Sequence, residues 1–225
     1  MKKFNIAIDG PAGAGKSSIA KAVASRIKCI YIDTGAMYRS VGIFAHQSSV
    51  DLKNEKKIAD LIEDMDMQIK CEEDGQHIYI NGKDMNSLIR TPEASMAASS
   101  VALIPAVRLK LVELQRRIAE NSSVIMDGRD IGTYVLPDAD VKIFLTASVE
   151  ERAGRRYKEL IEKGQNCTLD EVISDMIARD KQDTEREFAP LKQAEDSILL
   201  DTTGLSFDES VNKVIDIIEK SLSKW

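Results

Sequence analysis

A short glycine-rich segment near the start of the chain restricts the possible folds more than any other feature. Residues 10–17 read GPAGAGKS and fit the pattern G-x-x-x-x-G-K-[ST]. An apolar run at residues 4–8 precedes this segment, and apolar residues recur at helical spacing in residues 16–27. This order of strand, glycine-rich loop and helix predicts a loop that binds phosphate groups.

The chemistry of this loop follows from its glycines and from the helix that begins after it. Glycine has no Cβ, so the N–H groups of the loop can approach an anion closely, and the first N–H groups of the helix add partial positive charge. Lys16 is then placed to reach the β- and γ-phosphates, and the Ser17 hydroxyl to hold Mg²⁺. A plain Gly/Ala-rich turn with an exposed lysine is the alternative, but the flanking strand and helix favour a nucleoside triphosphate site.

Composition and charge exclude several classes of function. The chain has 225 residues, of which 43% are hydrophobic, and its net charge of −6 does not suit a protein that binds nucleic acid. The three cysteines, Cys29, Cys71 and Cys167, lie far apart, as do the two histidines, so we expect neither a disulfide framework nor a metal site from them. No apolar run approaches ~20 residues. We therefore expect a cytoplasmic monomer that binds neither nucleic acid nor a membrane.

Apolar runs alternate with helical periodicity along the chain, which predicts a doubly wound α/β fold with a parallel sheet. Strands are predicted at residues 4–8, 29–32, 123–126, 141–145 and 198–200. Helices are predicted at residues 16–27, 36–47, 58–65, 107–120, 148–163, 168–186 and 207–222. Several strands end in a carboxylate, among them Asp9 and Asp33, and ligands of such folds bind at this edge of the sheet.

Residues 67–85 depart from this alternation of strands and helices. Polar and apolar residues alternate there, and Asn81-Gly82 is a strong signal for a hairpin turn. We therefore expect a small antiparallel subdomain, inserted at residues 66–90 into a single domain that spans residues 1–225. After it, Thr91 is expected to cap a helix that begins at Pro92.

The arginines indicate which kind of phosphate chemistry the chain performs. The sequence lacks the N-K-x-D motif with which GTPase switches bind guanine, but it has four arginines that we expect to converge on the loop: Arg39, Arg129, Arg179 and Arg186. Transfer of a phosphoryl group between two nucleotides brings many negative charges together, so catalysis depends on positioning and on stabilising that charge. Guanidinium groups suit phosphate oxygens because they bind them in a bidentate manner.

Four stretches carry a resemblance to a known family. They are residues 9–18, residues 33–39 (DTGAMYR), residues 127–133 (DGRDIGT), and Arg179-Asp180 followed by Asp183 and Arg186. With these motifs in this order, the chain resembles the bacterial cytidylate kinases from its first strand to its last helix. The resemblance implies an α/β, three-layer P-loop NTPase fold with a five-stranded parallel sheet, a small antiparallel insert that binds the nucleoside monophosphate, and a helical lid at residues 151–167. It also implies transfer of the γ-phosphoryl group of ATP, with Mg²⁺, to CMP or dCMP.

The resemblance also assigns roles to single residues. It implies ATP binding by Gly10, Pro11, Ala12, Gly13, Ala14, Gly15, Lys16, Ser17 and Ser18, and by Arg152 and Arg156 of the lid. It places Thr34, Ser99, Arg108 and Asp130 on the cytosine, Arg39, Arg129 and Arg186 on the CMP phosphate, and Arg179 and Asp183 on its sugar. Lys16, Arg39, Arg129 and Arg186 are the residues expected to act in catalysis. Cytosine carries an exocyclic amine that needs an acceptor, and a carboxylate supplies one.

Other interpretations of these residues stay open. Asp127 and Asp130 could simply cap a turn after a strand, and Arg39 could be a solvated charge on a helix face. The arginines within residues 152–156 fit a lid that closes over ATP and an exposed basic helix face almost equally well. The activity has two alternatives as well. One is another P-loop kinase, for UMP or a non-nucleotide acceptor, and the other is a nucleotide-dependent switch without an acceptor.

Overall fold

The computed structural model describes residues 3–72 and 75–223, and the chain divides into two compact units. Unit 1 comprises residues 1–31 and 122–225, and unit 2 comprises residues 32–121. The organisation expected from the sequence, a single domain with an insert at residues 66–90 and a lid at residues 151–167, stays a prediction.

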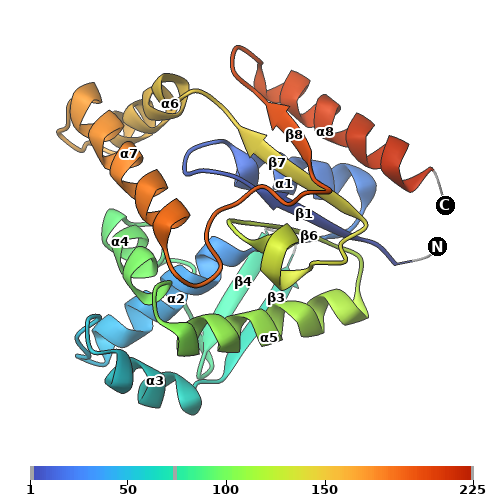
Figure 1. The fold of residues 1–225 in the computed structure, drawn as a ribbon. Helices are drawn as coiled ribbons and strands as arrows, with labels where there is room; N and C mark the ends of the chain where they lie inside the picture. Colours follow the sequence, from blue (N-terminus) through green and yellow to red (C-terminus); the bar gives the residue numbers. More distant parts are fainter. Residues whose placement is uncertain (1–2, 73–74, 224–225) are drawn as a thin grey trace. The chain divides into compact units, whose positions relative to one another are not determined.

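A five-stranded parallel sheet confirms the predicted fold class (Figure 1). Its strands lie in the order β2 (Ile30–Asp33), β6 (Val124–Gly128), β1 (Asn5–Asp9), β7 (Val141–Thr146) and β8 (Ile198–Asp201). The chain passes from unit 1 to unit 2 within β2. The central strand β1 is buried from its second residue onwards, and its last residue, Asp9, pairs in register with Gly128 on one side and Phe144 on the other. Residues near the carboxyl ends of three strands are thus neighbours in unit 1.

Two helices of unit 1 pack against each other and against this sheet. They are α1 (Lys16–Ile27) and α8 (Phe207–Leu222), and both have the predicted bounds. Their apolar faces and the strands share one core, which includes Ile6, Ile8, Ile19, Val23, Ile125, Ile143, Leu145, Val211 and Val214. Helix α8 begins with a capping box, in which the side chains of Ser206 and Glu209 each accept the other residue's backbone N–H.

A hairpin of two helices, α6 (Val149–Glu162) and α7 (Leu169–Glu185), also belongs to unit 1. Its own small core consists of Ala153, Val172 and Met176. The predicted separation of the two helices after residue 163 is confirmed: Gly164 has a φ of 74°, and Thr168 caps α7. A short π-helix, η1 (Ile131–Val135), follows β6 and was not predicted from the sequence.

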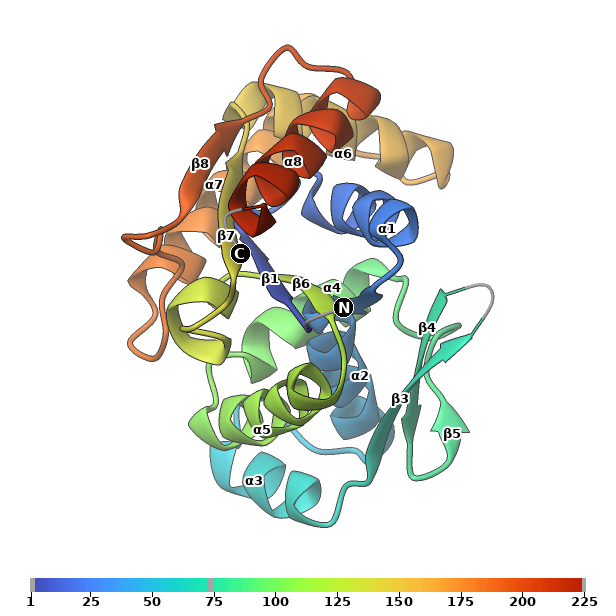
Figure 2. The ribbon, with the colours of Figure 1, turned by 90° about the vertical axis from the view of Figure 1, so that its right-hand side faces the viewer.

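Unit 2 contains helices and a small antiparallel sheet (Figure 2). The helices are α2 (Thr34–Gln47), α3 (Glu55–Glu63), α4 (Pro92–Val101) and α5 (Pro105–Asn121), and the strands lie in the order β3 (Met67–Glu72), β4 (Gly75–Ile80) and β5 (Lys83–Asp84). The predicted hairpin turn is confirmed, because Asn81 and Gly82 have φ values of 50° and 79° and join the paired strands β4 and β5. The predicted cap of α4 is confirmed too, since Thr91 Oγ1 accepts the N–H of Ala94 at 3.1 Å.

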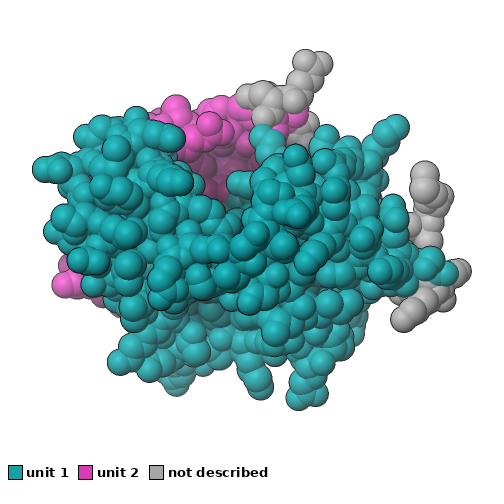
Figure 3. All heavy atoms as spheres, turned by 90° about the horizontal axis from the view of Figure 1, so that it is seen from above, with its two compact units in different colours: residues 1–31, 122–225 teal, residues 32–121 magenta. Residues whose placement is uncertain are grey.

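Helix α2 begins two residues earlier than predicted, because Asp33 caps it. The Asp33 carboxylate accepts the N–H of Ala36 at 2.7 Å, so Thr34 becomes the first helical residue. Within the described residues, no single helix is long and apolar enough to cross a membrane. Helices α4 and α5 reach the necessary length and apolar composition only when they are taken together, and a bend of 101° separates them. Figure 3 shows the two units as spheres, with unit 1 in teal and unit 2 in magenta.

Candidate active site

The glycine-rich loop lies between β1 and α1, and its backbone requires glycine at both ends. Gly10 has a φ of 148°, and a Cβ built there would lie 1.9 Å from the backbone oxygen of Leu145. Gly15 has a φ of 87°, in the left-handed region, and is the N-cap of α1. The chain therefore turns tightly from a buried strand into a helix, whose first N–H groups have no partners within the helix itself. Such a start is suited to binding an anion.

The side chain of Lys16 folds back on this loop. Its Nζ donates to the backbone oxygen of Pro11 at 2.7 Å, and the residue is only 5% exposed. Burial lowers the pKa of Lys16 well below its usual range, and the charge of Arg129 lowers it further, while three nearby aspartates act in the opposite direction. A bound polyphosphate would favour the charged lysine, because an opposite charge nearby raises the pKa of an ammonium group.

Ser17, the residue predicted to hold Mg²⁺, contacts a carboxylate that the sequence analysis had not assigned to the metal. The Ser17 hydroxyl donates to Asp127 Oδ2 at 2.7 Å, and the Tyr31 hydroxyl donates to Asp127 Oδ1 at 2.9 Å. The sequence held one signal for this carboxylate, since Asp127 directly follows the predicted strand at residues 123–126 and so lies near the carboxyl end of β6. In the described ranges, no group of three or more His, Cys, Asp or Glu side chains is arranged to hold a metal.

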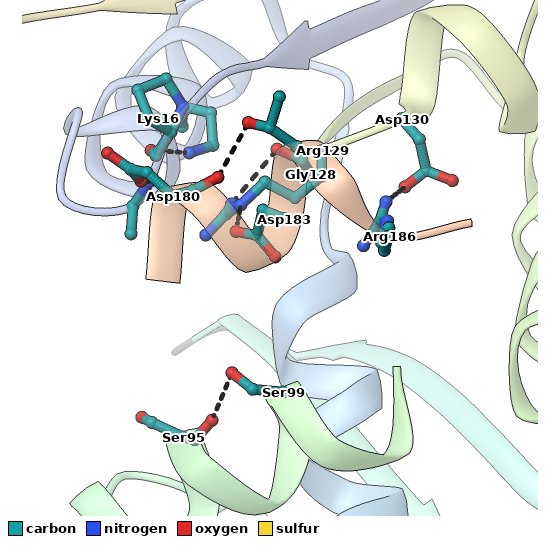
Figure 4. A network of polar contacts seen from close by, with 12 residues as sticks. Lys16, Ser95, Ser99, Gly128, Arg129, Asp130, Asp180, Asp183 and Arg186 are labelled. Carbon is teal, nitrogen blue, oxygen red and sulfur yellow. Dashed lines mark hydrogen bonds and ion pairs between the residues drawn. The ribbon is translucent and has the colours of Figure 1, made fainter. Parts of the chain in front are cut away.

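Several predicted site residues of unit 1 surround the carboxylate of Asp183. Arg129 Nε donates to Asp183 Oδ2 at 2.6 Å, and Figure 4 shows these two side chains pointing toward each other. Burial alone would raise the pKa of Asp183, but the pKa is lowered because the charge and the hydrogen bond of Arg129, together with the charges of Arg179 and Arg186, outweigh burial. The structure thus brings together four of the residues that the sequence analysis placed on the acceptor nucleotide.

Asp130 forms an ion pair with Arg186, and its side chain does not cap the helix that it precedes. Arg186 Nη2 lies 3.1 Å from Asp130 Oδ1, and both side chains are almost completely buried (Figure 4). Asp130 is the N-cap residue of η1, yet its side chain makes no capping hydrogen bond there. The capping acceptor is Asp9, whose Oδ1 and Oδ2 accept the N–H groups of Ile131 at 2.8 Å and of Gly132 at 2.7 Å. The interpretation of Asp130 as a simple turn cap is therefore wrong.

The arginines of α6 differ from one another in their environments. Arg152 is 4% exposed, donates to the backbone oxygen of Ala12 at 2.8 Å, and pairs with Asp180 at 2.7 Å. Asp180 Oδ1 in turn accepts the N–H of Ala12 at 3.2 Å, so α6 and α7 hold both backbone groups of one loop residue. Arg155 Nη1 lies 3.4 Å from a Cβ built on Gly15. An exposed basic face is therefore wrong for Arg152, which contacts the loop at Ala12, and Arg155 lies beside the loop at Gly15.

Arg156, which the sequence analysis placed on ATP, lies on the solvated side of the same helix. Its Nη1 pairs with Glu159 at 3.1 Å, and the side chain is 34% exposed. A role of Arg156 in binding ATP stays a prediction.

In unit 2, the residues predicted to bind the acceptor nucleotide lie on α2, α4 and α5. Arg39 Nη2 pairs with Asp33 Oδ2 at 2.9 Å, so Arg39 is not merely a solvated charge. Arg108 is 1% exposed, and its guanidinium lies 5.7 Å from the centre of the Tyr38 ring. Thr34 is buried at the start of α2.

Ser99, the remaining predicted residue of unit 2, faces its own helix. Its hydroxyl donates to the backbone oxygen of Ser95 at 3.2 Å, as Figure 4 shows. This bond occupies the hydroxyl proton but leaves the oxygen able to accept.

Comparisons with known proteins agree with these motifs. The family model described as cytidylate kinase matches residues 6–220. The chain is 49% identical to the cytidylate kinase of Caldicellulosiruptor bescii, over 98% of this chain and 97% of the relative. It is 51% identical to the cytidylate kinase of Lactobacillus gasseri, over 96% of this chain and 94% of the relative.

Among solved structures, an uncharacterized protein from Eubacterium ventriosum resembles the chain with a TM-score of 0.55. Its sequence identity is 14%, and the match covers 96% of this chain and 99% of the other, so this likeness concerns the fold alone. The sequence relatives carry the functional conclusion. They confirm the predicted phosphotransferase, and the chain belongs to the cytidylate kinase family.

Proposed function

We propose that the protein transfers the γ-phosphoryl group of ATP to CMP or dCMP, giving ADP and CDP or dCDP. Membership of the cytidylate kinase family supports this reaction. The observation that carries the proposal is the gathering of charges in unit 1: Arg129 and Asp183 lie close enough to influence the pKa of Lys16, and Arg129, Arg179 and Arg186 lie close enough to influence the pKa of Asp183. A cluster of cations beside a phosphate-binding loop is what the transfer of a charged phosphoryl group between two nucleotides requires.

On the donor side, the loop amides and Lys16 would bind the phosphates of ATP. The predicted residues Gly10 to Ser18 supply these groups, and Arg155, beside Gly15, is a better placed partner for the phosphates than Arg156. The hard oxygen donors of Ser17 and Asp127 fit a magnesium ion, which they would hold together with the nucleotide. Mg²⁺ neutralises negative charge on the phosphates when it is bound.

On the acceptor side, the proposal keeps the assignments that the resemblance implies. Arg39, Arg129 and Arg186 bind the CMP phosphate, Arg179 and Asp183 bind the sugar, and Thr34, Ser99, Arg108 and Asp130 bind the base. The acceptor phosphate is already anionic at neutral pH, so the reaction needs no strong general base. The protein contributes positioning, charge stabilisation and exclusion of water, which is the competing acceptor.

An acceptor screen tests the proposal. ADP release from ATP and Mg²⁺ is measured with CMP, dCMP, UMP, AMP and shikimate as acceptors, and without any acceptor. We expect CMP or dCMP to give the highest kcat/KM. UMP or shikimate as the best acceptor would support a different P-loop kinase, and equal ATP turnover with and without acceptor would support a nucleotide-dependent switch. Size-exclusion chromatography of the same preparation tests the monomer expected from the sequence.

The metal assignment has its own test. Asp127→Asn keeps the size of the side chain and removes its charge, so we expect half-maximal activity to require several-fold more Mg²⁺. Asp140→Asn is the matched control, because Asp140 is also a carboxylate of unit 1 and accepts the N–H of Asn5 at 2.6 Å, at the opposite end of β1. An unchanged Mg²⁺ requirement in Asp127→Asn would contradict the assignment.

A further inference from the structure

Asp9 is a nearly buried carboxylate of unit 1 to which neither the sequence motifs nor the proposed reaction gives a role. It is the last residue of β1 and directly precedes Gly10 of the phosphate-binding loop. Only 5% of its surface is exposed, and its two oxygens accept the N–H groups of Ile131 and Gly132 at 2.8 and 2.7 Å. These two residues follow Asp130 in the chain and begin η1.

Because Asp9 accepts these two N–H groups, the carboxylate of Asp130 is available for a different contact. A residue at the N-cap position commonly uses its own carboxylate to accept the first N–H groups of the helix. Here Asp9 accepts them instead, from a strand 122 residues earlier in the chain. The Asp130 carboxylate is consequently directed to Arg186, 3.1 Å away. Asp9 thus fixes the backbone from which Asp130 projects.

The surroundings of Asp9 indicate a hydrogen-bond acceptor with little freedom to move. Lys16 and Asp130 are the charged groups close enough to influence it, and burial, opposed by the two N–H groups, raises its pKa to about 6. A Cβ built on Gly132 would lie 3.4 Å from Asp9 Oδ2 and 3.2 Å from Lys142 Cδ. The segment 130–132 is therefore packed directly on the Asp9 carboxylate.

We propose that Asp9 is a positioning residue for acceptor specificity, which holds the segment 130–132 so that Asp130 meets the cytosine amine while the adjacent loop binds ATP. This inference rests on the proposed function, because it assigns the cytosine to Asp130. Asp9 itself touches neither nucleotide in this scheme. It acts through the backbone of Ile131 and Gly132, and it joins this segment to the residue before Gly10.

The test compares Asp9→Asn with Asp140→Asn. Asparagine has one oxygen for two N–H groups, so in Asp9→Asn the side-chain NH₂ would face a backbone N–H and the segment would shift. Asp140→Asn makes the same chemical change to a carboxylate that accepts one N–H at the other end of β1. The readouts are the ratio of kcat/KM for CMP to that for UMP, and hydrogen exchange at the amides of Ile131 and Gly132.

We expect Asp9→Asn to lower the CMP/UMP ratio about tenfold or more, since a misplacement of ~1 Å can cost about 10²-fold in rate. We also expect faster exchange at Ile131 and Gly132, with both readouts near wild type in Asp140→Asn. A merely structural role of Asp9 would lower kcat/KM equally for CMP and for UMP and leave their ratio unchanged. An unchanged ratio, or unchanged exchange at the two amides, would overturn the proposal.

A second variant keeps the proposal testable if Asp9→Asn does not fold. Gly132→Ala places a methyl group against Asp9 Oδ2 and against Cγ and Cδ of Lys142, and we expect it to lower the CMP/UMP ratio in the same direction. A wild-type ratio in this variant would contradict the inference. If the wild-type protein does not phosphorylate CMP, the proposed function fails, whereas the hydrogen-exchange comparison still shows whether Asp9 holds the segment.

Discussion

Asp130 offers the sharpest test of the site, because different substitutions separate its stabilising contact from its proposed contact with substrate. Arg186 and Asp130 are only 5% and 7% exposed at the side chain. Asp130→Ala leaves the guanidinium buried without this carboxylate, and removal of one partner from a buried pair costs about 3–5 kcal/mol. We expect about 3 kcal/mol, because Arg186 Nε keeps its hydrogen bond to Ala189 at 2.7 Å and Asp183 lies nearby.

Asp130→Asn retains an oxygen acceptor and should cost about 1 kcal/mol of stability. For a chain of this length, 1 kcal/mol shifts Tm by about 2–4 °C. Thermal unfolding should therefore show a decrease of about 6–12 °C for the alanine variant and about 2–4 °C for the asparagine variant. An alanine variant with the Tm of wild type would refute the contribution of the ion pair.

The kinetic assay measures kcat/KM with CMP and with UMP. Loss of the acceptor for the cytosine amine costs about 1–3 kcal/mol, so Asp130→Ala should lower kcat/KM for CMP by about 5- to 150-fold. The kcat/KM for UMP should fall less, because uracil presents a carbonyl where cytosine has the amine. Asp130→Asn should favour UMP further, since its NH₂ can donate to that carbonyl. Equal losses for the two substrates would refute the assignment of the base to Asp130.

Three further predictions concern single groups. Lys16→Met should lower kcat by about 10²–10³-fold because a charged donor to the transferred group is lost, and wild-type turnover would contradict this. Burial raises the pKa of Asp9 to about 6 in the folded protein, compared with 3.8 in the unfolded chain. Protonated Asp9 therefore stabilises the folded state by up to about 3 kcal/mol below pH ~4, and this stabilisation is lost as the pH rises through 6. The Tm difference between wild type and Asp9→Asn should accordingly fall between pH 4.5 and 7. Cys29 should react slowly with iodoacetamide at pH 8 unless urea is present, because burial raises its pKa to about 12.

The parts of the fold that local signals determine were predictable from the sequence. Helix α1 follows a glycine whose φ is positive, and α8 follows a capping box, so their bounds agree with the predictions. The turn at Asn81-Gly82 is likewise determined by a local sequence signal. The helix η1 was not predictable in this way, because its cap comes from Asp9, on a distant strand.

The same distinction between local signals and contacts of distant segments applies to the candidate site. Residue types and spacing identified the loop, Lys16 and the arginines, but not which carboxylate each cation would meet. Arg152 illustrates the difference, because its helix is strongly charged and only the fold shows that this side chain is buried against Ala12. Asp127 is a second residue whose contacts could not be predicted. Its place beside β1 depends on strand order, which the sequence pattern leaves undetermined.

Three cations of the candidate site in unit 1 have protein partners in this structure. Lys16 contacts its own loop, Arg129 contacts Asp183, and Arg186 contacts Asp130. A ligand phosphate therefore competes with carboxylates as well as with water, and only the difference in free energy contributes to binding. A phosphate dianion carries more charge than a carboxylate and has three oxygens for bidentate guanidinium contacts, so it should win this competition.

This exchange predicts that recognition of the base depends on the acceptor phosphate. Once phosphate oxygens occupy Arg129 and Arg186, the carboxylates of Asp183 and Asp130 become available for the sugar hydroxyls and the cytosine amine. Cytidine carries the same base and sugar but no phosphate, so both carboxylates would stay on their arginines. We expect cytidine to inhibit CMP phosphorylation only at concentrations at least about 100-fold above the KM for CMP, as two lost charge-assisted contacts of ~1.5 kcal/mol or more each imply. Inhibition by cytidine near that KM would show that Asp183 and Asp130 bind the nucleoside without first leaving the guanidinium groups.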